Sequence, residues 1–140
     1  MRRLSSVEAL TAFRQRILSE RSLQHDKPTL VVGAGTCSQA SGANDVIRVI
    51  KRYMLDHFLQ EKLNLRITGC QGFCEMDPYI LVEPGRHLYP KIEMEDVPRI
   101  IEATLSGRVE DELIYHDSRD QRKYQCQDDI PFFRKQTRTI

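Results

Sequence analysis

The sequence of 140 residues has little excess charge, no long apolar run and few cysteines. Its formal net charge of +1 argues against a general attraction to nucleic acid or to anionic membranes. No stretch approaches the roughly 20 apolar residues that a membrane-spanning helix needs, so no direct membrane insertion is expected. Charged residues interrupt the segment after the basic N-terminus, so that the apolar core of a signal peptide is missing and no signal peptide is expected. These absences predict a cytoplasmic protein, or one on the cytoplasmic side of a membrane-attached complex.

The cysteines are too sparse for a disulfide framework of the kind that small secreted domains use. In a reducing compartment such thiols are metal ligands, catalytic groups or plain core residues. The four are Cys37, Cys70, Cys74 and Cys126.

Apolar spacing and turn residues predict an α/β domain. Strands are expected at 29–33, 63–68, 79–83 and 87–92, and helices at 43–61 and 94–106. The order β-α-β-β-β-α, with an early β-α-β unit followed by a hairpin and a helix, indicates a thioredoxin-like layer.

The two ends of the chain add to this layer. Residues 5–24 predict an amphipathic helix capped by Ser5 or Ser6. Residues 116–129 are polar and predict a linker, and the segment 130–136 carries two aromatics that we expect to be exposed and to dock on another surface. The predicted organisation is an N-terminal helix (1–27), a thioredoxin-like domain (28–108), and a linker with a docking tail (109–140).

Three cysteines lie in loops that such a layer brings together. Cys70 and Cys74 share a loop with Gly69 and Gly72, whose backbone can fold around a metal centre and direct N–H groups at it. Cys37 follows the first strand. Because the loops after the first two strands leave the sheet at the same end, the three sulfurs are expected to converge.

Several functions fit these cysteines. They could be buried core residues, or zinc ligands with a histidine such as His57 or His87, although neither histidine has a spacing relation to a cysteine. A [2Fe-2S] cluster usually takes four thiolates, so Cys126, a serine or a water would complete it. Thiol-redox catalysis is a further class, but it normally uses two cysteines separated by two residues at a helix N-terminus.

The segment 33–38 is a rival motif, because Gly33, Gly35 and Ser38 resemble a dinucleotide-binding turn. The match is weak: a loop over 33–42 is expected before the next helix, and no acidic residue follows the second strand to hold a ribose. The glycines are better explained by close approach of the backbone to the neighbouring loop or to a cluster.

Longer stretches carry a family resemblance over roughly residues 29–140. Gly35-Thr36-Cys37, Ser41-Gly42-Ala43 and Thr68-Gly69-Cys70-Gln71-Gly72-Phe73-Cys74 resemble the N-terminal thioredoxin-like [2Fe-2S] ferredoxin domain of the flavin-carrying, NADH-binding subunit of bacterial NADH dehydrogenases. The same domain occurs in the related subunits of NAD-dependent hydrogenases and formate dehydrogenases. Tyr89-Pro90-Lys91-Ile92 and the segment Asp129-Ile130-Pro131-Phe132-Phe133 support the resemblance.

The resemblance implies a ferredoxin-like electron-transfer domain with a [2Fe-2S] cluster on Cys37, Cys70 and Cys74. The family's first loop has two cysteines four residues apart, whereas here Cys37 stands alone and Val32, Gly33 and Ser38 occupy the neighbouring places. The implied partner is a flavin- and NADH-binding domain or subunit, because this chain has no flavin or NAD site and is not catalytic alone. The alternative is a cluster-free thioredoxin-like interaction module of the same complex.

Overall fold

The centre of the protein is a four-stranded mixed sheet. The computed structural model describes residues 5–24 and 27–137; parts of the expected N-terminal region and tail, residues 1–4, 25–26 and 138–140, lie outside the described residues. The strand order is β2-β1-β3-β4, with β1 parallel to β2 and the other pairs antiparallel. The strands are β1 (Thr29–Gly33), β2 (Asn64–Thr68), β3 (Ile80–Glu83) and β4 (His87–Tyr89).

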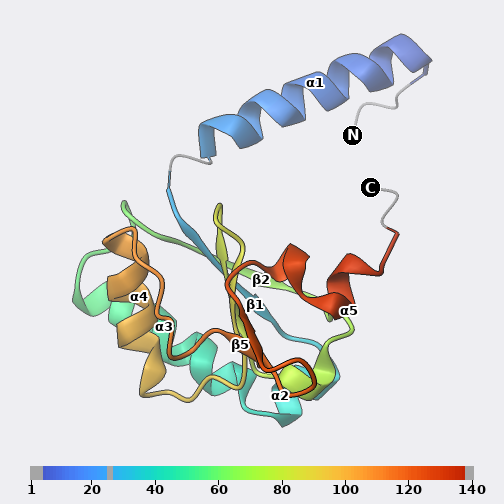
Figure 1. Ribbon diagram of the computed structural model, residues 1–140. Helices are drawn as coiled ribbons and strands as arrows, with labels where there is room; N and C mark the ends of the chain where they lie inside the picture. The colour runs from blue at the N-terminus through green and yellow to red at the C-terminus, as the bar shows by residue number, and fades with distance from the viewer. Residues whose placement is uncertain (1–4, 25–26, 138–140) are drawn as a thin grey trace.

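Two helices cover one face of this sheet, as Figure 1 shows. They are α3 (Ala43–Asp56) and α4 (Asp96–Leu105), and a short α2 (Thr36–Ala40) precedes α3. Their apolar faces pack on the sheet because buried residues recur at helical spacing. The central residues of this core are Leu30, Val32, Val46, Ile50, Ile80, Val97, Ile100 and Ile101. The predicted thioredoxin-like α/β architecture is confirmed.

Some element boundaries differ from the prediction for local reasons. Helix α3 ends at Asp56 rather than near residue 61, because Phe58 has a left-handed backbone (φ 54°) that a helix cannot continue through. Strand β4 ends at Tyr89 because Pro90 has no N–H for a sheet ladder. The loop expected over 33–42 is wrong, since α2 begins directly after Gly35.

The region expected to be a linker contains regular structure, so that prediction is wrong. A hairpin pairs β5 (Tyr115–Asp117) with β6 (Arg122–Tyr124). Its turn is held by two aspartates: the Asp117 carboxylate accepts the Arg119 N–H (2.9 Å) and Asp120 accepts the Arg122 N–H (2.9 Å). The strands of this hairpin are short and largely solvent-facing, so their residues are mostly polar. They therefore lack the alternation of apolar and polar residues from which a strand is normally predicted.

The tail covers the second face of the sheet. A 3₁₀ turn η2 (Gln127–Asp129) leads into a short helix α5 (Pro131–Arg134). Ile130 is fully buried and Phe133 is 4% exposed, whereas Phe132 is 38% exposed. The expectation of two exposed aromatics is therefore wrong for Phe133, which packs on this chain's own sheet. This second core contains Val31, Phe73, Tyr79, Leu81, Leu88, Tyr115, Ile130 and Phe133.

Helix α1 (Val7–Gln24) forms as predicted and extends away from the sheet in Figure 1. Ser6 caps it, because its hydroxyl oxygen accepts the Ala9 N–H at 3.1 Å. The apolar residues that predicted an amphipathic helix are largely open to solvent, since Val7, Leu10 and Leu18 are more than half exposed. No helix within the described residues combines the length and apolar character required to cross a bilayer.

Candidate metal centre

Two loops meet at one edge of the sheet. Because β1 and β2 are parallel and Gly33 pairs with Thr68, the segments that follow these two strands leave the sheet at the same level. The Ala34 N–H donates to the Thr68 carbonyl at 2.8 Å, which extends the pairing into the loops. The segment after β1 enters α2, which carries Cys37. The segment after β2 is the loop 69–78, which holds Cys70 and Cys74. Cys74 is the first residue of the short 3₁₀ turn η1 (Cys74–Met76).

The two loops touch at Gly35. A Cβ on Gly35 would lie only 2.9 Å from the Cβ of Cys70 and 3.4 Å from its backbone nitrogen. Real Cβ atoms essentially never approach another heavy atom so closely, so glycine at this position allows the contact. The prediction that the loop glycines permit close backbone approach holds at Gly35.

The thiols of Cys70 and Cys74 are already arranged as a pair. Their sulfurs lie 3.6 Å apart. Two thiolates bound at about 2.3 Å to one tetrahedral metal, the distance typical of zinc, would lie about 3.8 Å apart. The Gly72 N–H donates to the Cys70 sulfur at 3.2 Å, which favours negative charge on that sulfur. The pair therefore has the geometry of two ligands on one metal ion.

The third loop cysteine is close enough to affect this pair. Hydrogen bonding to the Cys70 thiol, and then to the Cys37 thiol, raises the pKa of the Cys74 thiol to about 11. Cys37, Cys70 and Cys74 are all exposed free thiols. The structure thus brings the Cys70 and Cys74 sulfurs together, whereas the convergence of all three sulfurs and their role as ligands stay predictions.

The raised pKa predicts slow alkylation of Cys74 in the metal-free protein. A group whose pKa lies above its ordinary value remains protonated at neutral pH, and only the thiolate reacts. We expect iodoacetamide to modify Cys74 far more slowly at pH 7 in the folded protein than in the same protein in denaturant, with the difference shrinking as the pH approaches 11. Peptide mass spectrometry measures this. Equal rates in the two states would show that Cys74 is not held as a neutral thiol.

Aromatic stacking holds the middle of the cysteine loop. Phe73 is buried next to Cys74, and its ring stacks on Phe132 at 4.6 Å between centroids. The Phe133 ring contacts Phe73 edge-on at 5.2 Å. The tail, which lies nearly sixty positions along the chain, therefore fixes the position of the loop between the two cysteines.

A buried amide network joins the same segments. The fully buried Gln127 side chain donates to the Gln71 side-chain oxygen at 2.7 Å and accepts from the Arg86 guanidinium at 2.6 Å. Arg86 also pairs with Asp128 at 2.7 Å. Sequence reasoning missed these residues because their contacts join three distant segments and follow no local spacing.

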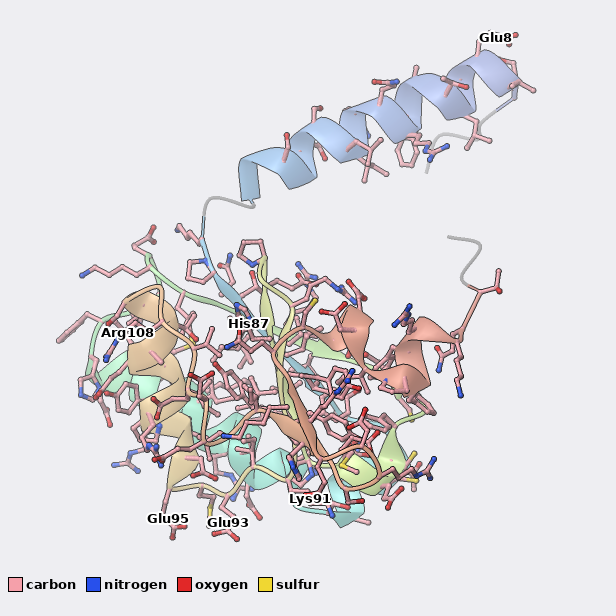
Figure 2. The ribbon with its side chains drawn as sticks, in the orientation of Figure 1. Glu8, His87, Lys91, Glu93, Glu95 and Arg108 are labelled. Carbon is pink, nitrogen blue, oxygen red and sulfur yellow. The ribbon has the colours of Figure 1, made fainter. Side chains whose placement is uncertain are left out.

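Cys126 lies elsewhere. Its backbone forms an isolated bridge with His87, and His87 pairs with Val82 toward the amino end of β1. Figure 2 shows His87 in the upper half of the sheet region, whereas Lys91, whose N–H donates to Met76 of η1 at 3.0 Å, lies at the lower end. The register thus puts Cys126 toward the end of the sheet opposite the other cysteines.

The histidines weighed for zinc are engaged in other contacts. His57 stacks on Tyr53 at 4.0 Å, and His87 contacts the Gln125 carbonyl at 3.2 Å. Across residues 5–24 and 27–137, no group of three or more His, Cys, Asp or Glu side chains could hold a single metal ion. A two-iron cluster distributes its ligands over two metals, so it does not need all of them around one point.

Solved structures with this fold include iron–sulfur proteins. The wild-type thioredoxin-like [2Fe-2S] ferredoxin from Aquifex aeolicus matches with a TM-score of 0.58 and 22% identity, over 65% of this chain and 98% of that one. Another structure of a thioredoxin-like [2Fe-2S] ferredoxin from that organism gives 0.59 and 19%, over 70% and 98%. Two single variants of the Aquifex ferredoxin, each with serine in place of one cysteine, match with a TM-score of 0.58 and 21% identity. No protein-family model matches the chain. The likeness establishes a thioredoxin-like ferredoxin fold.

Proposed function

We propose that this chain is an electron-transfer domain that holds a [2Fe-2S] cluster through Cys37, Cys70 and Cys74. The observation that carries the proposal is that three exposed thiols lie on two touching loops at one edge of the sheet, with the Cys70 and Cys74 sulfurs 3.6 Å apart. The fold is that of proteins described as [2Fe-2S] ferredoxins, which supports the choice of cluster over zinc. When bound, the cluster would supply a site for one-electron transfer.

The residues present account for three of the four usual ligands. Cys126 is directed toward the other end of the sheet by its bridge with His87. Ser38 is buried and its hydroxyl donates to the Asp77 carboxylate at 2.9 Å, so it is engaged elsewhere. A water, or a serine released from its present contacts, is therefore a better fourth ligand than Cys126.

Single cysteine replacements test the ligand set. Protein reconstituted with iron and sulfide without oxygen should show a visible thiolate-to-iron absorption band. Cys70→Ser and Cys74→Ser should lose most of this band, whereas the matched control Cys126→Ser should keep it. Circular dichroism should show all three variants folded, because these side chains lie outside both apolar cores. A band that survives in Cys70→Ser and Cys74→Ser would refute the ligand assignment.

We further propose that the domain works beside an NADH-oxidising flavoprotein, as a relay near its flavin. The sequence resemblance in the cysteine loop and in the segment 129–133 supports this context. In a mixture with such a flavoprotein subunit, NADH should bleach the cluster absorbance without oxygen. NADH should leave the isolated chain unchanged. Absence of bleaching and of binding in the mixture would contradict the partner and leave the cluster proposal intact.

The alternative is a cluster-free interaction module. The two loops hold only three cysteines, one fewer than the usual four ligands, and this favours the cluster-free module. This alternative predicts that a Cys70→Ser/Cys74→Ser double variant binds the flavoprotein as well as the natural chain does, and that neither protein retains iron.

A further inference from the structure

One buried polar group beneath the cysteine loops has no partner. Tyr79 directly precedes β3, is 2% exposed, and its hydroxyl proton has no hydrogen-bond acceptor among the described residues. Such a hydroxyl costs about 1–3 kcal/mol of folding free energy when it is left unsatisfied. Buried polar groups nearly always have partners, so an isolated one needs an explanation.

The hydroxyl lies against Gly33, the last residue of β1 before the chain enters the first cysteine loop. Its oxygen is 3.5 Å from where a Cβ on Gly33 would be, and the Ser38 hydroxyl oxygen is 3.4 Å from the same point. The Ser38 proton is engaged with Asp77. The Tyr79 hydroxyl therefore remains the donor without an assigned acceptor at the end of β1.

The sulfurs of Cys70 and Cys74 in the neighbouring loop would gain negative charge when metal binds. Burial, and after it the charges of Asp77, Cys70 and Cys74, raise the pKa of Tyr79 to about 12, although the backbone N–H of Gln71, pointing at the hydroxyl oxygen, lowers it. The sheet register places the hydroxyl in the same neighbourhood, because it lies against Gly33, and Gly33 pairs with Thr68, two residues before Cys70. A neutral thiol is a weak acceptor, but a thiolate accepts a strong, charge-assisted bond.

We propose that Tyr79 is a positioning residue of the metal centre, whose hydroxyl donates a hydrogen bond to the Cys70 sulfur once that sulfur is a cluster-bound thiolate. This inference rests on the proposed function. The buried donor is then held in place by the fold before the cluster binds, and it is satisfied only in the loaded protein. Hydrogen bonds to cluster sulfurs stabilise the more negative, reduced state, so this one raises the reduction potential.

A pair of tyrosine variants tests the proposal. Tyr79→Phe should leave the unfolding free energy of the cluster-free protein unchanged or increase it, and should shift the midpoint potential of the loaded protein to a more negative value. The matched control is Tyr89→Phe, because Tyr89 is equally buried but its hydroxyl already accepts the Glu110 N–H at 3.2 Å. It should lower the stability and leave the midpoint potential unchanged.

The outcomes separate this inference from the proposed function. If the natural protein takes up a cluster and Tyr79→Phe does not change the midpoint potential, the role of Tyr79 is refuted and the cluster stands. If Tyr79→Phe destabilises the cluster-free protein as much as Tyr89→Phe does, the hydroxyl has a partner without the cluster, which also refutes it. A natural protein that takes up no iron refutes the proposed function and this inference with it.

Discussion

Replacing Phe133 with alanine should lower the free energy of unfolding by about 3–5 kcal/mol, the usual cost of removing a buried phenylalanine from a core. Phe133 is 4% exposed and lies in the core on the second face of the sheet, with Phe73, Tyr115 and Ile130. Its removal would leave a cavity under the cysteine loop. Urea unfolding of the cluster-free protein, followed by circular dichroism, measures the loss.

The neighbouring phenylalanine is the matched control. Phe132 contacts the same Phe73 ring but is 38% exposed, so Phe132→Ala should cost about 1 kcal/mol. Equal losses in the two variants would contradict the packing of the tail described here. A negligible loss in both would show that the tail does not belong to the folded core.

Replacing Gly35 with alanine should separate the two cysteine loops. The backbone of Gly35 (φ −68°, ψ 171°) is one that alanine adopts readily, so the effect is steric and comes from the 2.9 Å approach to the Cys70 Cβ. That atom is fixed close to the backbone, so the whole loop must move. We expect a loss of about 1–3 kcal/mol in stability, the range for overpacking, and loss of most of the cluster after reconstitution.

Gly69 provides the control for this variant. It lies in the same pair of loops, but a Cβ there would meet nothing within 4 Å. Gly69→Ala should therefore keep the cluster and should be neutral or slightly stabilising, because alanine restricts the unfolded chain. Similar cluster content in Gly35→Ala and Gly69→Ala would show that the loops do not need their close contact.

The sequence predicted the parts of this fold that depend on local periodicity. The apolar run 29–33 coincides with β1, and the contact between the loop of Cys37 and the loop of Cys70 followed from the parallel order of the first two strands. The polar hairpin and the burial of Phe133 could not be predicted in this way. Both depend on the second face of the sheet being open to the tail, which is a tertiary property.

The residues beneath the cysteines show the same limit. In the sequence Tyr79 is an ordinary aromatic residue at the start of a predicted strand. Only the structure shows that its hydroxyl is buried and that the hydroxyl proton has no acceptor. Gln127 lies in a polar stretch that resembles a linker, yet it is fully buried and contacts Gln71. Side-chain contacts between distant segments have no sequence period, so pattern analysis does not find them.

The most direct measurement is the iron and acid-labile sulfide content of the full chain purified without oxygen, compared with its Cys70→Ser/Cys74→Ser variant. One [2Fe-2S] cluster on three cysteines predicts about two irons and two sulfides per chain in the natural protein and almost none in the variant. A natural chain that holds no iron or sulfide after anaerobic reconstitution, while its fold is intact, would contradict the cluster.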